Sequence, residues 1–179
     1  MSKPDKEVSV LKELLEYVKM IIFVLAAVLI IQNFLIINAK IPSESMEETI
    51  MTGDRVFGNR LSYLVKKPER MDIVIFKYPD DESQLFIKRI IGMPGETVEI
   101  RDGKVYINGS DTPLDDSFTP ETPTGSWGPY VVPENHYFVM GDNRNDSRDS
   151  RYWNNTYVSE DKILGKAIFR YFPGIKILK

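Results

Sequence analysis

An uncharged, strongly apolar run near the N-terminus constrains this chain more than any other feature. From Met20 to Ile37 the sequence reads MIIFVLAAVLIIQNFLII, in which Gln32 and Asn33 are the polar residues. A helix of about 17–25 apolar residues is long enough to cross the hydrocarbon core of a bilayer. We therefore expect a transmembrane helix over residues 20–37, preceded by a short amphipathic segment over residues 1–19.

A cleavable signal peptide is the competing interpretation of this run, because an apolar stretch after lysines resembles the hydrophobic region of such a peptide. The run is long for that role, and Asn38, Ala39 and Lys40 make a poor small-residue cleavage site. Basic residues flank the run on both sides, so the positive-inside rule gives only a small bias towards a cytoplasmic N-terminus. We expect a single-pass protein of the cell membrane, with residues 1–19 in the cytoplasm and residues 38–179 on the extracytoplasmic side.

The composition narrows the function of the remaining domain. The 179 residues are 42% hydrophobic and carry a net charge of -3 without a basic stripe, so one compact domain is expected and nucleic-acid binding is not. No cysteine is present, which excludes disulfides, thiolate catalysis and zinc–thiolate sites. The single histidine, His136, excludes a multi-histidine metal site. We expect neither a metal nor a cofactor.

Strand patterns dominate the sequence after the apolar run. Segments rich in β-branched and aromatic residues are bounded by proline, glycine and acidic turns, and one pair flanks an Asp-Gly turn typical of a β-hairpin. We expect strands at residues 72–78, 85–91, 96–100, 104–107, 137–140 and 166–172. Residues 102–133 contain five prolines and are expected to form a small cap. The predicted fold class is therefore mainly β, with antiparallel sheets forming a coiled core, a Pro-rich cap and one N-terminal transmembrane helix.

Two serines, Ser43 and Ser45, lie in the segment IPSESMEETI that closely follows the apolar run. Most segments of this kind are ordinary loops or helix caps, since proline and serine favour turns and N-caps. A serine hydroxyl becomes a useful nucleophile only when a base lies beside it. The function of these serines therefore depends on whether another part of the chain supplies a base.

A candidate base lies on the second expected strand. Alternation along residues 85–91 puts Lys88 on one face and Arg89 on the other, so each face carries one basic residue among apolar neighbours. In an edge strand both side chains would extend to water. If Lys88 is buried instead, its pKa falls and the amine can act as a base, whereas an arginine stays protonated.

The most polar segment, residues 141–153, reads GDNRNDSRDSRYW. Its charge suggests a calcium loop, but an EF-hand beginning at Asp142 would require different residues at its third, sixth and twelfth positions. Either a solvated loop or a hydrogen-bonded network that supports a site fits this composition. The possible ion-pair partners of Asp149, among which the sequence does not choose, are Arg144, Arg148 and Arg151.

Taken together, these segments resemble the bacterial type I signal peptidases, which are membrane-anchored serine proteases that remove signal peptides from exported proteins. The resemblance covers nearly the whole chain, and its single anchor is like that of the Gram-positive forms. The motifs that carry it, in the expected order, are the N-terminal anchor, PSESM at 42–46, GDR at 53–55, RMDIVIF at 70–76, KRIIGMPG at 88–95, and GDNR at 141–144 with DSRYW at 149–153.

The resemblance implies a Ser/Lys dyad. In this family the serine before the methionine is the nucleophile and the lysine of the Lys-Arg pair is the general base, which here are Ser45 and Lys88. The serine two residues before the nucleophile, here Ser43, helps to bind the oxyanion. Ser147 matches the serine that hydrogen-bonds the lysine amine. The supporting network is matched by Asp142, Asp149 and Arg151.

The implied activity is that of a serine endopeptidase that cleaves N-terminal signal peptides from exported preproteins at small-residue, A-x-A-like sites. Membrane lipid is a second expected partner, and the protein is expected to be monomeric. Many relatives have proline or asparagine where Glu48 stands, and Glu44 and Glu47 add further acid near the nucleophile, which leaves substrate preference open. Residues 38–44 span at most ~25 Å when extended, so the active site is expected at or near the membrane surface.

Three other functions share some of these features. LexA-type self-cleaving repressors also use a Ser/Lys dyad, but they carry a DNA-binding domain where this chain has its apolar run. A Ser/His/Asp hydrolase would use His136, yet no Gly-x-Ser-x-Gly motif surrounds any serine. A membrane-tethered, non-catalytic β module that binds exported chains would have no need of both Ser45 and Lys88.

Overall fold

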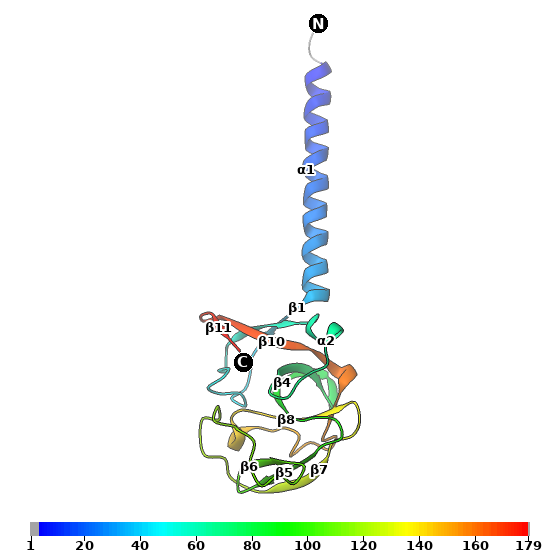
Figure 1. Ribbon diagram of the computed structural model, residues 1–179. Helices are drawn as coiled ribbons and strands as arrows, with labels where there is room; N and C mark the ends of the chain where they lie inside the picture. Colours follow the sequence, from blue (N-terminus) through cyan, green and yellow to red (C-terminus); the bar gives the residue numbers. More distant parts are fainter. Residues whose placement is uncertain (1–3, 179) are drawn as a thin grey trace. The chain divides into compact units, whose positions relative to one another are not determined.

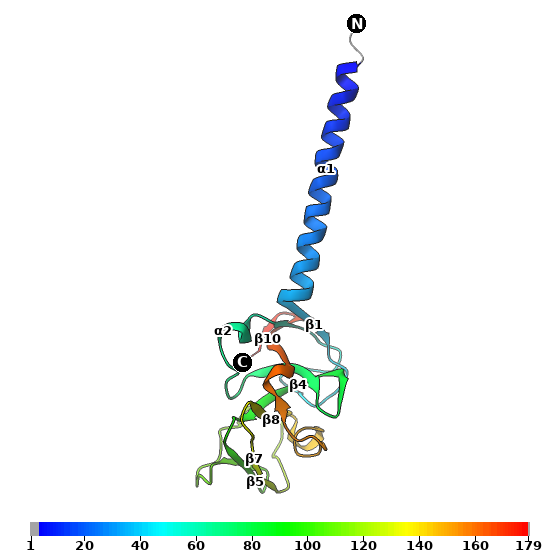
Figure 2. The ribbon, with the colours of Figure 1, turned by 90° about the vertical axis from the view of Figure 1, so that its right-hand side faces the viewer.

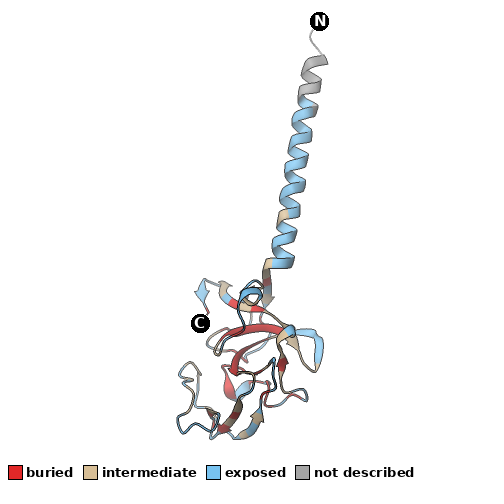
Figure 3. Ribbon diagram, turned by 45° about the vertical axis from the view of Figure 1, so that its right-hand side comes forward, coloured by how far each residue is buried: buried red, intermediate tan, exposed pale blue. Residues whose placement is uncertain are grey.

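The computed structural model describes residues 4–178 and divides the chain into two compact units, Met1–Ile36 and Ile37–Lys179. The first unit is helical: α1 (Pro4–Ile30) is followed by one π-helical turn, η1 (Ile31–Leu35). Its side chains from Lys12 onward are almost all exposed (Figure 3). Lys12–Leu35 is long and apolar enough to cross a membrane, as judged by length and composition.

The helix ends two residues before the boundary that the apolar run predicts. Ile36 has an extended backbone, with φ -120° and ψ 140°, and it begins strand β1 (Ile36–Lys40). Ile37 is only 4% exposed and belongs to the core of the second unit. The predicted span of residues 20–37 therefore includes two isoleucines that form part of a strand, because β-branched residues suit a buried strand as well as a membrane helix.

The second unit contains a large sheet and a small one, confirming the mainly β fold class (Figure 1). The large sheet has eight strands, with β11 paired to β10 and the others in the order β1-β2-β10-β3-β4-β8-β9. Beyond β1, these strands are β2 (Arg55–Asn59), β3 (Ile73–Tyr78), β4 (Asp81–Gly92), β8 (His136–Met140), β9 (Val158–Ser159), β10 (Ile163–Phe172) and β11 (Lys176–Ile177). From β2 to β9 in this order, neighbouring strands pair antiparallel.

The small sheet has the order β6-β5-β7, and two of its strands, β6 and β7, lie within the predicted cap region, residues 102–133. Its strands are β5 (Thr97–Arg101), β6 (Lys104–Ile107) and β7 (Trp127–Val131). Asp102 and Gly103 join β5 to β6 with φ of 49° and 80°, which confirms the predicted Asp-Gly hairpin. Within the second unit, this sheet lies at the end opposite β1 and β10 (Figures 1 and 2).

All six expected strands are confirmed, five of them with shifted ends, and several short elements were not expected. β4 begins at Asp81, so the acidic turn expected at residues 80–82 is shorter than predicted, and the first half of the strand is exposed. The unexpected strands β1, β2, β7, β9 and β11 are short or contain few consecutive apolar residues. The short helices α2 (Ser62–Val65), η2 (Arg144–Asp146) and η3 (Glu160–Lys162) complete the unit.

Candidate active site

The segment between β1 and β2 carries Ser43 and Ser45 and is fixed at both ends. The Ile41 N–H donates to the Asp54 carbonyl at 2.9 Å, and the Gly53 N–H donates to the Ile41 carbonyl at 2.8 Å. Met46 and Ile50 are fully buried in the core that also contains Ile37. Ser45 is 7% exposed as a result, so its hydroxyl is held in a fixed and largely dry position.

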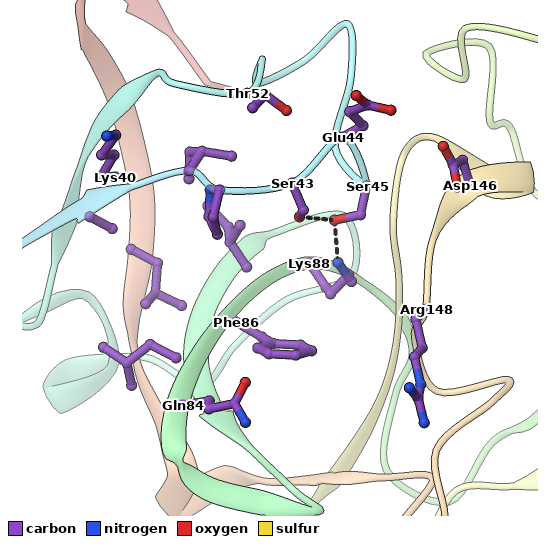
Figure 4. A pocket seen from close by; sticks show the side chains of 16 residues that line it. Lys40, Ser43, Glu44, Ser45, Thr52, Gln84, Phe86, Lys88, Asp146 and Arg148 are labelled. Atoms are coloured by element: carbon purple, nitrogen blue, oxygen red, sulfur yellow. Dashed lines mark hydrogen bonds between the residues drawn. The ribbon is translucent and has the colours of Figure 1, made fainter.

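Lys88 reaches this segment from the middle of β4, which lies between β3 and β8. Its Nζ lies 2.5 Å from Ser45 Oγ, and Ser43 Oγ lies 3.3 Å from the same oxygen (Figure 4). Lys88 is 4% exposed and Arg89 is 3% exposed, so the interpretation in which both side chains extend to water is wrong.

Burial lowers the pKa of Lys88 from 10.5 to about 8. The carboxylates of Asp149 and Asp142 act in the opposite direction and favour the charged amine, while Arg151 disfavours it. Desolvation of the ammonium is the largest of these effects. An appreciable fraction of the amine is therefore neutral at mildly alkaline pH, as a general base requires.

Arg89, on the opposite face of β4, holds Asp142 with two hydrogen bonds. Its Nε donates to one carboxylate oxygen at 2.8 Å and its Nη2 to the other at 2.7 Å. Thr49 Oγ1 also donates to Asp142, at 2.6 Å. The serine segment, β4 and the loop after β8 are thus joined through one fully buried carboxylate.

Asp149 organises the rest of that loop, and its partner is Arg151. Arg151 Nε donates to Asp149 Oδ1 at 2.8 Å, and the Gly141 N–H donates to Asp149 Oδ2 at 3.0 Å. Arg144 pairs instead with Asp116 of the Pro-rich region, at 2.7 Å. Residues 141–151, apart from the exposed Asn145, Asp146 and Arg148, therefore form a buried hydrogen-bonded network, and the solvated-loop interpretation is wrong.

Ser147 is the one predicted site residue without its implied partner. Its Oγ is buried and has no hydrogen-bond partner within residues 4–178, so the implied bond to the Lys88 amine is not formed. The hydroxyl packs against Gly141 instead, where an added Cβ would come within 2.2 Å of it. Its role in orienting Lys88 stays a prediction.

Sequence reasoning missed three residues that this network uses. Thr49 and Asp116 lie 93 and 28 positions from their partners, and no local pattern reports contacts over such separations. Phe118 covers the guanidinium of Arg89, whose central carbon is 4.2 Å from the ring centroid. A phenylalanine among prolines and acids was the available signal, because an isolated large apolar residue in a polar loop usually has a surface to cover.

A cavity of about 630 Å³ opens beside Ser45 and Lys88. Its walls come from β1, the serine segment and the first half of β4, with Asp146 and Arg148 at one side (Figure 4). Aliphatic side chains such as Ile41, Ile75 and Ile87 make the lining mainly apolar. The cavity can accept an extended chain with small apolar side chains next to the serine hydroxyl.

Among the side chains that the structure describes, no group of three or more histidine, aspartate and glutamate residues could hold a metal ion. His136 begins β8, and its ring Nδ1 lies 2.9 Å from the Glu134 carbonyl; in the described part of the chain no hydrogen bond joins the ring to a serine hydroxyl. The arrangement can activate a serine hydroxyl with an amine and stabilise an oxyanion beside it.

Comparisons with known proteins agree with this geometry. The family described as "Signal peptidase, peptidase S26" matches residues 14–172. A probable signal peptidase I-2 of Synechocystis sp. is 41% identical, covering 80% of this chain and 66% of the relative. Signal peptidase I of Leptolyngbya laminosa is 39% identical, covering 89% of this chain and 80% of the relative. Signal peptidase I S of Bacillus subtilis is 35% identical, covering 94% of this chain and 95% of the relative. The chain therefore belongs to the S26 family, as a type I signal peptidase that cleaves signal peptides from preproteins and has a single N-terminal membrane anchor and an extracytoplasmic catalytic domain.

Proposed function

We propose that this signal peptidase cleaves its substrates with Ser45 as nucleophile and Lys88 as general base. The observation that carries the proposal is the 2.5 Å contact between Lys88 Nζ and Ser45 Oγ, made by an amine whose pKa burial lowers to about 8. Neutral Lys88 takes the proton of the Ser45 hydroxyl as Oγ attacks the carbonyl carbon of the scissile peptide. The carbonyl π electrons move to oxygen and form the oxyanion of a tetrahedral intermediate.

Ser43 Oγ and the Ser45 N–H are proposed to bind that oxyanion. When the intermediate collapses, the carbon–nitrogen bond breaks and the amine of the mature protein takes the proton from Lys88. Water then attacks the ester on Ser45, with Lys88 again accepting a proton, and releases the signal peptide with a free carboxyl group. Each proton taken by Lys88 is returned, so the enzyme ends the cycle unchanged.

The remaining site residues act by holding this arrangement. Asp142 joins Arg89 of β4 to the serine segment through Thr49, and Asp149 with Arg151 fixes the backbone at Gly141. Ser147 is proposed to orient the amine once a substrate or water is present. All of these groups come from one chain, which supports a monomer as the active form.

Preference for small residues before the scissile bond is proposed from the cavity beside Ser45. Its lining includes the β-branched side chains of Ile41 and Ile87, which are both buried in the core. Small side chains such as alanine would fit without displacing these walls. A large side chain at the same position would have to move buried core residues, which is unfavourable in a close-packed interior.

We also propose that the catalytic domain, residues 38–179, contacts lipid. Leu64 and Val65 of α2 are exposed and are followed by Lys66 and Lys67, a combination that suits the interface of an anionic bilayer. The soluble catalytic domain, without the membrane anchor, is expected to sediment with anionic vesicles. Leu64→Ser with Val65→Ser should reduce that binding, and unchanged binding would remove α2 from the proposed contact.

Cleavage of a preprotein by the wild type and by matched variants tests the dyad. Ser45→Ala and Lys88→Ala are each expected to abolish cleavage while the circular dichroism spectrum and melting temperature stay close to those of the wild type. Ser43→Ala is expected to lower kcat by about 10²–10³, the usual effect of losing one oxyanion donor. Near-normal cleavage by Ser45→Ala would refute the proposed nucleophile, and complete loss in Ser43→Ala would point to that serine instead.

A further inference from the structure

Asn143 contacts the backbone on both sides of Ser45. Its Nδ2 donates to the Glu44 carbonyl at 3.2 Å, and its own backbone N–H donates to the Ser45 carbonyl at 3.2 Å. Asn143 is 8% exposed, so water competes little for either bond. One residue thus holds both peptide planes that flank the Ser45 Cα.

The first of these planes carries the amide assigned above to the oxyanion. Because a peptide group is planar, the direction of the Glu44 carbonyl also sets the direction of the Ser45 N–H on the opposite side. The Glu44 carbonyl accepts a second hydrogen bond, from the Glu47 N–H at 2.9 Å. Within residues 4–178 the Ser45 N–H itself donates to no protein acceptor, so it is available to a substrate oxygen.

Hydrogen bonds at the carbonyl end of a peptide also strengthen its other end. A donor at the oxygen polarises the amide, and the N–H becomes a better donor in turn. The Asn143 bond therefore does two things to the Ser45 N–H: it fixes its direction and increases its strength. Both effects count most when negative charge develops on the substrate oxygen.

The backbone around Asn143 is packed against the serine segment too closely to shift. A Cβ added at Gly141 would come within 2.3 Å of the Ser45 carbonyl oxygen, so only glycine allows this approach. Asp142, between Gly141 and Asn143, is held by Arg89. Asn143 is therefore presented to Glu44 from a rigid support.

We propose that Asn143 is a positioning residue of the oxyanion hole, acting through the Glu44–Ser45 peptide on the Ser45 N–H. The role rests on the proposed function of Ser45 as nucleophile. It differs from the roles of Asp142 and Asp149, which hold side chains and the loop, because Asn143 acts on the donor that faces the substrate.

The test compares Asn143→Ala and Asn143→Asp with the wild type in steady-state kinetics on a signal-peptide substrate. Asn143→Asp keeps the side-chain shape but cannot donate to the Glu44 carbonyl, so it separates a lost donor from a lost volume. Asn145→Ala is the matched control. Asn145 lies in the same loop but is exposed, and it bonds to Thr122 and Thr124 instead of the serine segment.

Both Asn143 variants are expected to lower kcat by about 10-fold, less than the loss of a direct oxyanion donor, with KM changed less than about twofold. The inhibition constant of a substrate-like peptide aldehyde should rise by the same factor as kcat falls. Such an aldehyde adds to Ser45 Oγ and leaves its oxygen where the oxyanion forms. The acidic limb of the pH profile of Asn143→Ala should not move, because this variant leaves Lys88 untouched and adds no charge near it, and Asn145→Ala should behave as wild type.

Wild-type kcat in both Asn143 variants would overturn the inference. So would a fall in kcat with unchanged aldehyde binding, or a fall matched by Asn145→Ala, because either pattern indicates a general loosening of the loop. These outcomes are distinct from failure of the proposed function, which Ser45→Ala reports on its own. If Ser45→Ala were active, the nucleophile would be wrong and the role of Asn143 would be overturned with it.

Discussion

Lys88 becomes a base through its surroundings. The same residue type at Lys66 and Lys67 is exposed to water. On β4 the side chain lies between a buried strand and the serine segment, where the charged form loses its hydration. Lys88 and its neighbour Arg89 are both buried, but only the lysine can act as a base, and Arg89 instead binds Asp142.

The pH dependence of cleavage follows from the lowered pKa of Lys88. Protonated Lys88 cannot accept the Ser45 proton, so kcat/KM is expected to rise with pH and to level off above the pKa of about 8. At pH 7 the rate should be roughly a tenth of the plateau value, as for any base one unit below its pKa. Initial rates in constant-ionic-strength buffers measure the profile. A flat profile across this range would contradict the assignment of the base.

Lys88→Arg provides the control for that profile. Arginine keeps the positive charge and much of the length, but it stays protonated at all accessible pH values. We expect no cleavage at any pH, measured on the same substrate. Activity that recovers in Lys88→Arg at high pH would mean that another group accepts the proton.

Sequence reasoning proposed Ser45 and Lys88 through the family resemblance, which rests on several motifs in order, because the serine segment alone is like many ordinary loops. It did not reach Thr49 or Asp116, since their contacts form only after distant segments meet. The alternation along β4 assigned Lys88 and Arg89 to opposite faces but could not tell whether either face was covered. That information comes from the serine segment, the loop after β8 and the Pro-rich loop, which lie elsewhere in the chain.

Among the elements, the irregular loop between β6 and β7 is tied to the active site by one ion pair. Asp116 accepts from Arg144, a fully buried side chain of η2, and Asn145 binds the same loop at Thr122 and Thr124. The proline content of this region predicted a cap, but it could not predict which surface the cap would cover. In the structure the loop covers the buried arginines Arg89 and Arg144.

Asp116→Ala tests this connection. Removal of the carboxylate leaves Arg144 buried without its ion-pair partner, which typically costs about 3–5 kcal/mol of stability. We expect a clearly lower free energy of unfolding, measured with urea on the soluble catalytic domain. Asp115→Ala, next to it in sequence but exposed, should differ from the wild type by only a few tenths of a kcal/mol. Similar effects of the two variants would mean that the ion pair with Arg144 contributes little.

For the whole molecule, the position of the boundary between anchor and catalytic domain matters for any soluble form. β1 begins at Ile36, and Ile37 is buried with Ile41 and Ala167 in the core of the second unit. A soluble form designed on the assumption that the helix runs to Ile37 would therefore lack Ile36 and Ile37 of β1. Hydrophobicity alone cannot find the boundary, because the bilayer and the protein core select the same isoleucines.

Two truncated forms, beginning at Ile36 and at Asn38, should therefore differ in stability. The shorter form loses two of the five residues of β1 and leaves a cavity at Ile37, for which a loss of about 2–5 kcal/mol is typical. Thermal unfolding measures the difference, with melting temperature expected to be lower for the form that begins at Asn38. Equal melting temperatures would show that Ile37 adds nothing to the core.

The burial that makes Lys88 a base also has a thermodynamic cost. The amine has a folded-state pKa of about 8 and an ordinary unfolded pKa of 10.5, so below pH 8 the folded protein holds a cation that water would hold better. This penalty is fully present at pH 7, shrinks as pH rises from 8, and is gone above 10.5. Lys88→Met, inactive but without the charge, should unfold at a higher temperature than the wild type at pH 7 and lose that advantage in alkaline buffer. The amine that accepts the proton in catalysis is therefore also a group that lowers the free energy of unfolding at neutral pH.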